Sequence, residues 1–590
     1  MKLFVFSLLI IFLPAVVYSQ SLSSQWVTPY ESSGYKKTPR YDETMQYCRK
    51  LAKASPWVHI GSFGTSPEGR DMPLIIVSKD KIFTAAKAQK SGKAIVLIQN
   101  GIHAGEIDGK DASLMLIRDI AVTKTKASLL DHVILLVIPF YNVDGHERFS
   151  PYNRINQNGP EEMGWRVTAQ NLNLNRDYMK ADAPETQAWL KLYMAWLPDF
   201  LVDCHVTDGA DFQYVVTYTV ETHENLAAPV RSWVKNNYIP SVTAKMEAMS
   251  MPIVPYVNLR DNKDLSKGLD GGAAPPRFST SYAALQNRPA LLVETHMLKD
   301  YKTRVDGTYK ILTATLEILN RDFKILRSAI LDADKLTVEK LDNPFPLSFN
   351  QVDAPNETIH FLGYKAKIEK SDISGADKVV WTHDPLNIDI PRFDSVKVAV
   401  SVTPPVAYLI PPQWDEVIRR LQLHGVIFLK LKQPVELEVE MYKFSKPKWQ
   451  QNPYEGHHPV TYSVNASTEK RTIPARTMIA RTNQRAARVL INALEPQAPD
   501  AFVAWGFFDA IFEQKEYAEG YVLEQLAPQM LMKDSLLKIE FEKKLQADTA
   551  FAHSPYARLN FFYQRSPYWD KNLNVYPVAR LMKDTTLPVQ

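Results

Sequence analysis

Short apolar runs alternate with amphipathic segments over the first part of the chain. The runs are rich in Val, Ile and Leu, and each is bounded by Gly, Pro or polar residues. This composition is typical of strands that are buried on both faces of a sheet. Their alternation with helical segments continues to about Ala333 and predicts an α/β domain. Four of these runs are Ala94–Gln99, Val133–Phe140, Phe200–Asp203 and Ala290–Val293.

A different pattern begins after about Asp342. Ser395–Val402 and Val435–Tyr442 alternate apolar and polar residues, which predicts antiparallel strands. Trp414–His424 lies between a Pro-Pro pair and a glycine and predicts a helix, and Tyr517–Ala547 has helical periodicity. The second part of the chain is therefore expected to be β-rich but mixed.

The chain divides at this change of pattern. We expect an α/β domain over residues 20–340 and a β-rich accessory region over residues 341–590, which is long enough for two subdomains. The junction around Pro344–Pro346 is too short to act as a long flexible tether. We therefore expect the two parts to pack against each other.

The first residues form a basic and apolar leader. Lys2 precedes the apolar stretch Leu3–Val17, and small residues lie near Ser19, before Gln20. This order is typical of a signal peptide, which we assign to residues 1–19. A membrane anchor is the alternative, but about 20 apolar residues are needed to span a bilayer and this stretch is shorter. We therefore expect a secreted or periplasmic protein without a stable membrane span.

Charge and cysteine content narrow the classes of partner and of stabilising bond. The 590 residues carry 69 basic and 65 acidic side chains, a formal charge of +4, and contain no Lys/Arg tract of the kind that follows a phosphate backbone. We therefore do not expect nucleic acid as a partner. Cys48 and Cys204 are the only cysteines, so stability must come from packed cores. Whether they pair stays open, although we favour a buried free thiol at Cys204.

Residues that can bind a metal follow two of the apolar runs. His103 and Glu106 are three residues apart, close to one helical turn, where a strand gives way to the expected helix Asp108–Ile120. His205 follows another run about a hundred residues later, and in open α/β sheets sites form beyond the carboxyl ends of the strands. Two His and one Glu with an open fourth position are the ligand set of catalytic zinc, which predicts one Zn²⁺ per chain.

Two further carboxylates belong to the same edge of the predicted sheet. Asp203 shares the strand face of His205, where it either orients the His205 ring or packs as a polar core residue. Glu294 follows the run Ala290–Val293. A buried carboxylate beside a metal can take the proton of a water molecule and pass it to a leaving amine, so we expect Glu294 to be a general base. A surface glutamate at a strand end is the alternative.

Together these residues resemble the zinc carboxypeptidases of the funnelin family, which include carboxypeptidases A and B. The resemblance covers roughly Pro39–Ala333, about half of the chain, and implies a mixed, mostly parallel twisted sheet flanked by helices. The matching motifs, in order, are G-x-S-x-E-G-R at Gly64–Arg70, H-A-G-E at His103–Glu106, N-V-D-G at Asn142–Gly145, N-L-N-R-D at Asn173–Asp177, D-C-H at Asp203–His205 and L-V-E-T at Leu292–Thr295.

The resemblance implies a role for each matched residue. Asn175 and Arg176 match the pair that holds a substrate's terminal carboxylate, and Arg166 resembles the arginine that stabilises the oxyanion. The implied substrate is a peptide or peptide-like molecule with a free C-terminal carboxylate. The implied zinc ligands are His103, Glu106 and His205, with Glu294 as general base and proton shuttle.

Three positions depart from the family's pattern. Gly105 stands where many digestive members carry an arginine that contacts substrate. Tyr282 is our candidate for the tyrosine that caps the substrate, but its spacing to Glu294 is short, and an exposed loop aromatic is an equal alternative. Arg260–Thr280, which would contain the residue that sets side-chain preference, has no convincing match.

The sequence thus favours an exported zinc metallocarboxypeptidase over two other functions. One is a zinc amidase or endopeptidase that acts on cell-wall peptides or modified amino acids. The other is a non-catalytic binding protein on a peptidase fold, which would be expected to lack a ligand or the base. His457–His458 predicts a loop pair rather than a second metal site, because no carboxylate or Cys accompanies it at ligand spacing.

Overall fold

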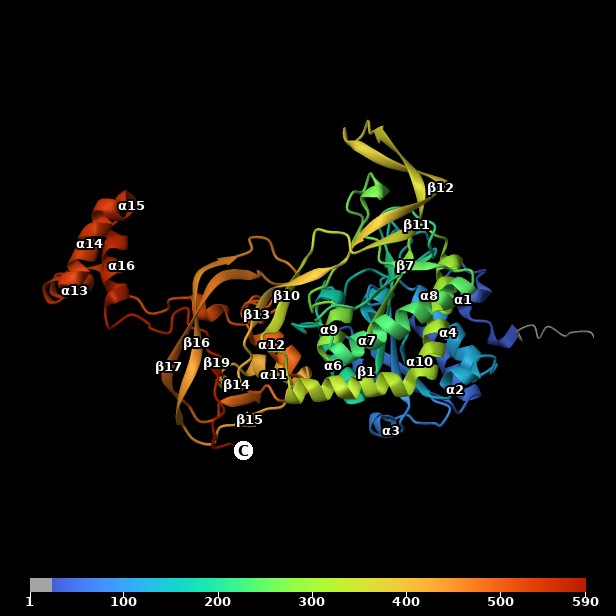
Figure 1. Ribbon diagram of the computed structural model, residues 1–590, viewed down its shortest axis with the longest axis horizontal. Helices are drawn as coiled ribbons and strands as arrows, with labels where there is room; N and C mark the ends of the chain where they lie inside the picture. Colours follow the sequence, from blue (N-terminus) through green and yellow to red (C-terminus); the bar gives the residue numbers. More distant parts are fainter. Residues whose placement is uncertain (1–23, 590) are drawn as a thin grey trace, which may run out of the picture.

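The computed structural model describes residues 24–589, and the expected signal peptide lies outside these described residues. An α/β domain forms one end of the molecule, and the accessory region extends from it (Figure 1). Among the described helices, none is both long enough and apolar enough to cross a membrane.

The α/β domain is built on an eight-stranded mixed sheet. Its central strands β4, β3, β5 and β9 are parallel to one another, whereas β1, β2 and the β6–β7 pair join its edges through antiparallel neighbours. Every residue of β3, β4 and β5 is buried, so helices cover both faces of the sheet. In spatial order the strands are β1 (Val58–Thr65), β2 (Asp71–Val77), β4 (Val133–Ile138), β3 (Ala94–Asn100), β5 (Phe200–Thr207), β9 (Ala290–His296), β6 (Val216–Val220) and β7 (Ile253–Pro255).

The helices of this domain pack in two groups. α10 (Tyr301–Glu339) lies along α4 (Asp108–Ala121), α7 (Ala228–Trp233) and α8 (Ile239–Ala248). Trp189 of α6 (Pro184–Trp196) meets Tyr282 of α9 (Ser279–Leu285), with 6.2 Å between the ring centroids. The remaining helices of the domain are α1 (Pro29–Ser32), α2 (Tyr41–Ala54), α3 (Ala85–Lys90) and α5 (Val143–Glu147).

A six-stranded sheet forms the centre of the accessory region. It packs with two helices, α11 (Asp415–Leu423) and α12 (Ala487–Leu494), and β10 (Phe345–Gln351) pairs with β13 (Val396–Val402) beside it. In spatial order the six strands are β15 (Leu429–Lys430), β18 (Met478–Arg481), β14 (Ala407–Ile410), β19 (Ala579–Leu581), β16 (Val435–Trp449) and β17 (Val460–Ile473).

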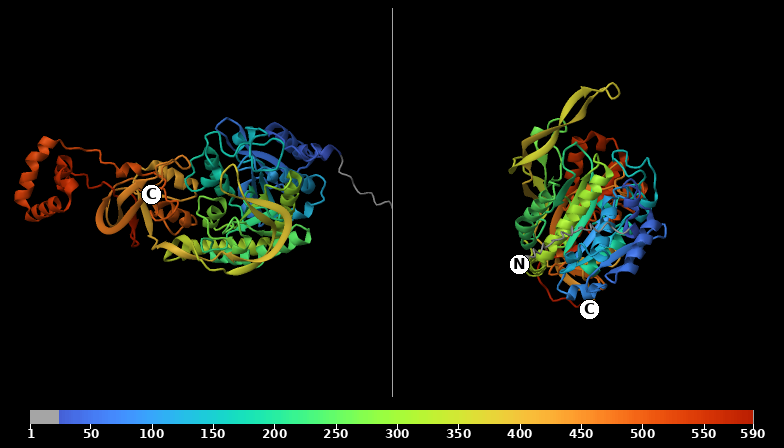
Figure 2. Two further views of the ribbon diagram at one scale, coloured as in Figure 1. Left: turned by 90° about the horizontal axis from the view of Figure 1, so that it is seen from above. Right: turned by 90° about the vertical axis from the view of Figure 1, so that its right-hand side faces the viewer.

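Two elements project from this body. The hairpin of β11 (Glu357–Lys370) and β12 (Asp377–Phe393) rises beside the α/β domain (Figures 1 and 2). At the opposite end, a small helical extension stands away from the six-stranded sheet (Figures 1 and 2). It consists of α13 (Gly520–Lys533), α14 (Ser535–Ala547), α15 (Thr549–Ala552) and α16 (Pro555–Arg565), packed around a small core of its own.

The expected packing of the two parts is confirmed. One hydrophobic core contains Tyr193 and Tyr282 from the α/β domain together with Leu421, Leu490 and Phe502 from the accessory region. The 39-residue helix α10 runs from the first part toward the second (Figure 1), where it packs against α12. A shared core and a continuous helix therefore join the parts more firmly than the short junction alone would.

The main expectations about fold class are also confirmed. The sheet is mixed and mostly parallel, helices flank it, and the region after about residue 341 is rich in strands. The predicted helices at Asp108–Ile120 and Trp414–His424 correspond to α4 and α11. Cys48 and Cys204 are both buried and free, so no disulfide joins them.

Candidate active site

The residues expected at the strand ends come together at the carboxyl edge of the sheet. After β3, a turn at Gly101 with φ 62° leads the chain to His103 and Glu106 and then into α4. His205 and Glu294 do not follow their strands but lie inside β5 and β9, where they are register partners on neighbouring parallel strands. Paired residues of adjacent strands present their side chains on the same face. Glu294 therefore lies beside the His205 side chain.

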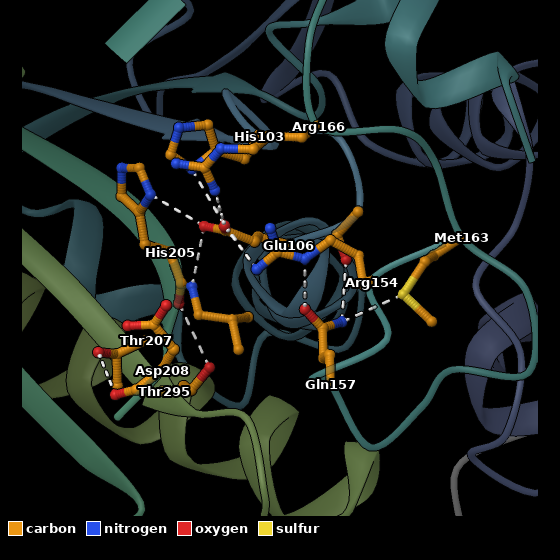
Figure 3. Close-up of polar contacts among 12 residues, drawn as sticks. His103, Glu106, Arg154, Gln157, Met163, Arg166, His205, Thr207, Asp208 and Thr295 are labelled. Carbon is orange, nitrogen blue, oxygen red and sulfur yellow. Dashed lines mark hydrogen bonds and ion pairs between the residues drawn. The ribbon is translucent and has the colours of Figure 1, made fainter. Parts of the chain in front are cut away.

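His103, Glu106 and His205 form a buried group with the geometry of a metal site. Glu106 Oε1 lies 3.0 Å from His103 Nδ1, and Glu106 Oε2 lies 3.0 Å from His205 Nδ1 (Figure 3). One ligand atom from each residue falls within 4.8 Å of the others, and no other group of this kind occurs among residues 24–589. The three side chains that the sequence proposed as ligands therefore lie around one point.

The outer nitrogens of both imidazoles face oxygen acceptors. His103 Nε2 is 3.1 Å from Asn173 Oδ1, and His205 Nε2 is 3.0 Å from Asp203 Oδ2. Such acceptors favour the proton on Nε2 and leave the Nδ1 lone pairs directed at the centre of the group. Burial lowers the pKa of His103 to about 4, which keeps this ring in the neutral form that binds metals. The donor set and its surroundings therefore fit a metal ion.

Glu294 is a buried carboxyl group with a free oxygen. Its side chain is only 9% exposed, and its Oε2 has no hydrogen-bond partner among the described residues. Burial, reinforced by Glu106 and opposed by His205, raises the pKa of Glu294 to about 8. A carboxyl group in this condition can exchange a proton near neutral pH. Because Glu294 lines the same cleft as the metal-binding group, it can reach a water molecule there.

Two arginines approach the metal-binding carboxylate. Arg166 Nη1 lies 3.2 Å from Glu106 Oε1, and Arg154 Nη2 lies 2.8 Å from the same oxygen. In Figure 3, Arg154 and His205 reach Glu106 from opposite sides. Arg154 Nε donates to Gln157 Oε1, and the Gln157 amide in turn donates to the Gly105 carbonyl oxygen. Arg154 could not be predicted from the sequence, because it lies in a loop with no periodic pattern.

The expected carboxylate clamp lies on a short turn beside the metal-binding group. Asn173 Oδ1 accepts a hydrogen bond from the Asn175 amide, so the residue that faces His103 also holds the turn. Arg176 stacks over the Phe278 ring, with 4.2 Å from its guanidinium carbon to the ring centroid. Asn175 and Arg176 both line the cleft. Their guanidinium and amide groups are therefore available to a carboxylate bound there.

The expected substrate-capping role of Tyr282 does not fit its position, and this is a correction. Tyr282 is fully buried in α9, and its hydroxyl contacts His424 Nδ1 of the accessory region and the Gln286 amide rather than the cleft. Tyr256, 38 residues before Glu294, lines the cleft instead, and its pKa is raised to about 12 by burial and by Glu294. Every residue of α9 is buried, so the spacing between Tyr282 and Glu294 along the sequence could not place the Tyr282 hydroxyl in the cleft.

The cleft around these residues is large, and residues from both the α/β domain and the accessory region line it. It has a volume of about 1580 Å³, above the range of about 300–1,000 Å³ that is usual for a small-molecule site. Residues of the α/β domain surround the His103, Glu106 and His205 group, and the accessory region contributes residues from around the start of β11 and the end of β12, including Glu357, Arg392 and Asp394. The cleft can therefore hold an extended ligand rather than a single amino acid.

Comparisons with known proteins agree with this site. Residues 44–226 match the family model described as zinc carboxypeptidase, a range that contains His103, Glu106 and His205. Two relatives, both named carboxypeptidase 2, are 25% identical to this chain. The protein from Trichophyton rubrum aligns over 484 residues, 79% of this chain and 84% of the relative, and the protein from Trichophyton equinum over 505 residues, 83% and 88%. Matches of this length must extend into the accessory region.

Among solved structures, a metallo-carboxypeptidase from Burkholderia cenocepacia aligns with 48% of this chain and 70% of its own, at 18% identity and a TM-score of 0.35. At this score the superposition adds nothing to the sequence matches. The sequence matches and the His-Glu-His site at the sheet edge agree with the resemblance noted from the motifs. Residues 44–226 therefore match the zinc carboxypeptidase family, and the matches together support a metallocarboxypeptidase enzyme.

Proposed function

We propose that this protein is an exported zinc carboxypeptidase that removes residues from the C-terminus of peptides. One observation carries the proposal: the buried group of His103, Glu106 and His205 shares a single cleft with Glu294 and Arg176. A metal-binding group, a carboxyl group that can move a proton and an arginine for a terminal carboxylate are the parts that this reaction needs. Export is proposed from the leader at residues 1–19.

His103, Glu106 and His205 would hold one Zn²⁺ and leave a fourth position for water or substrate. Their fit rests on the two Nδ1 atoms that face Glu106 and on the acceptors that hold the two Nε2 atoms. When bound, zinc supplies Lewis acidity, which polarises a carbonyl group and lowers the pKa of water.

Side chains of the protein then supply proton transfer, stabilisation of the oxyanion and binding of the terminal carboxylate. Glu294 takes a proton from the attacking water and delivers it to the nitrogen of the departing amino acid. Arg166 donates to the carbonyl oxygen as negative charge develops there. Arg176, with Asn175 beside it, binds the terminal carboxylate through charge-assisted hydrogen bonds and so selects a free C-terminus.

The test uses the mature protein with its metal content measured. It is incubated with pairs of peptides that differ only in a free or an amidated C-terminus, and the products are identified by mass. We expect about one zinc per chain and the loss of single terminal residues from the free-acid peptides alone. Internal cleavage, or equal cleavage of the amidated peptides, would contradict the proposal and favour the amidase or endopeptidase alternative.

A further inference from the structure

The far side of the cleft is formed by the accessory region. The hairpin begins and ends at this cleft, because residues from the start of β11 and from the end of β12 line it together with the metal-binding group. None of these residues belongs to the matched motifs of the α/β domain. They are Asn356, Glu357, Ile359, Arg392, Asp394, Ser395 and Val396.

The floor of the cleft connects Glu294 to this far side. β9 and β6 are antiparallel neighbours, with Glu294 opposite Thr217 and Leu292 opposite Thr219. Alternate residues of a strand share one face and are separated by about 6.6 Å. Leu292, Thr219 and then Glu221 therefore follow Glu294 along one face, and these three residues line the cleft. The floor thus leads away from the metal-binding group toward Glu221.

A chain of polar contacts connects the α/β domain to the accessory region along this part of the cleft. Glu221 Oε1 lies 2.7 Å from His223 Nδ1, and His223 Nε2 lies 2.8 Å from the Asp394 carbonyl oxygen and 3.6 Å from Asp394 Oδ1. The Asp394 carboxylate also accepts a hydrogen bond from the Gly272 amide at 2.8 Å and pairs with Arg392 at 2.7 Å. Asp394 therefore connects the accessory region to two segments of the α/β domain, one at His223 and one at Gly272. We call the part of the cleft lined by Glu221, His223, Arg392 and Asp394 the pocket end.

The accessory wall is fixed in place. The short strand β8 (Leu269–Asp270) pairs with the end of β12, and a side chain at Gly271 would place its Cβ 2.1 Å from Asp394 Oδ1. Phe212 of the α/β domain and Phe361 of the hairpin belong to one small buried core, with 6.1 Å between their ring centroids. Paired strands, a close approach that only glycine allows and a shared core make this wall a permanent part of the cleft.

The charges at the pocket end alternate in sign along the contacts. Glu221 and Asp394 are acidic, and His223 and Arg392 lie against them as basic partners. Asp394 is thus one of the carboxylates beside these two basic groups, because His223 also pairs with Glu221 and Arg392 also pairs with Glu357. Without its charge, the pocket end would become more positive while keeping almost the same shape.

We propose that Asp394 determines side-chain specificity: the pocket that receives the C-terminal side chain of the peptide ends at Asp394, whose charge disfavours acidic side chains there. The inference rests on the proposed carboxypeptidase function, because Arg176, which would bind the terminal carboxylate, lines the same cleft as Leu292 and Asp394. A terminal glycine has no side chain to enter the pocket and is insensitive to its far end.

The test compares four peptides of one sequence that end in Gly, Leu, Lys or Glu. Asp394→Asn is expected to raise the ratio of kcat/KM for the Glu peptide to that for the Lys peptide at least tenfold, with the Gly peptide within threefold of wild type. Asn356→Asp, which adds a negative charge to the same wall, should shift the ratio in the opposite direction. The matched control is Asp384→Asn, an exposed position on the same hairpin that does not line the cleft.

The outcomes separate the two proposals. If the wild-type enzyme cleaves the free-acid peptides but neither variant moves the ratio, Asp394 does not determine specificity. An equal loss for all four peptides in both variants would also overturn the inference, because it would indicate a purely structural role. If the wild-type enzyme cleaves no free-acid peptide, the proposed function itself fails, and this inference fails with it.

Discussion

Two regions of the α/β domain each bury a glutamate with an unpaired oxygen, and only one of these glutamates lines the cleft. Glu294 lies in β9, and Glu185 lies in the first turn of α6, where it is fully buried. Burial raises the pKa of Glu294 to about 8 and that of Glu185 to about 7, and Glu185 has no hydrogen-bond partner for either oxygen among the described residues. The two carboxyl groups are therefore similar in their proton affinity.

What separates them is access. Glu294 lines the cleft beside His205, whereas Glu185 is buried in the interior near Asp144 and Asp177 and does not line this cleft. Asp144 is already paired with Arg70, and Asp177 with Lys180, so neither cation is left for Glu185. A raised carboxyl pKa thus reports the loss of water around the group, and the open space beside it decides whether the group can do chemistry.

The largest expected effect is on kcat, when Glu294 in the cleft is replaced by a side chain that cannot carry a proton. Glu294→Gln keeps the shape and burial of the side chain but removes its capacity to carry a proton, so we expect kcat to fall by about 10²- to 10⁴-fold. Zinc content, measured on the same preparation, should stay at the wild-type value. The matched variant Glu185→Gln should retain kcat within about twofold. A Glu294→Gln enzyme that binds zinc and works at the wild-type rate would exclude Glu294 as the base.

A smaller effect concerns stability and is tested at Glu185, which does not line the cleft. A carboxyl group whose pKa is raised by folding stabilises the folded state below its ordinary pKa of 4.5, and this contribution is lost as pH rises through about 7. Glu185→Gln is neutral at every pH. We therefore expect wild type to lose stability relative to this variant between about pH 4.5 and pH 7, by at most about 3 kcal/mol.

Thermal unfolding of both proteins at pH 5 and pH 8 measures this difference. The control is Glu524→Gln, which changes an exposed glutamate on the helical extension. A stability difference that is independent of pH, or that has the opposite sign, would show that Glu185 is not neutral in the folded protein.

The smallest expected effect concerns a third glutamate, which reaches the site from the accessory region. Glu455 Oε2 accepts a hydrogen bond of 3.2 Å from the Asn173 amide, and Asn173 in turn contacts His103 and the Asn175 amide. Loss of one such bond costs about 0.5–1.5 kcal/mol. Glu455→Ala should therefore raise KM for free-acid peptides by about two- to tenfold with little change in kcat.

Two further variants test whether the change in KM comes from loss of the Glu455 acceptor oxygen. Glu455→Gln keeps an acceptor oxygen and should restore most of the wild-type KM, whereas Gln451→Ala, an exposed change in the same loop, should have no effect. An unchanged KM in Glu455→Ala would mean that the turn at Asn173–Arg176 holds its position without the hydrogen bond from the accessory region.

The comparison also explains which parts of the site could be predicted from the sequence. His103, Glu106, His205 and Glu294 follow or end apolar runs, and the packing of parallel strands brings such positions to one edge of the sheet. Their roles remain proposals, but their proximity follows from periodicity alone. The apolar runs also identified the main strands, and the Pro-Pro pair and glycine that bound Trp414–His424 identified α11.

Residues that reach the cleft from irregular segments gave no such signal. Arg154 lies in a loop with a φ of 56°, and Asp394 reaches the pocket only because two residues of β8 pair with the end of β12. The prediction for Tyr282 was wrong for a related reason. Every residue of α9 is buried, so spacing along the sequence could not indicate which way the Tyr282 hydroxyl points. Contacts between segments far apart in the chain decide all three cases.

The 39-residue helix α10 has a consequence for the shape of the molecule in solution. At 1.5 Å per residue it is about 58 Å long, and it runs from the catalytic half toward the accessory half (Figure 1). A continuous helix acts as a strut, because bending it sharply breaks backbone hydrogen bonds. In solution the protein should then rotate as one elongated particle with a single set of rotational diffusion constants, rather than as two domains that rotate independently.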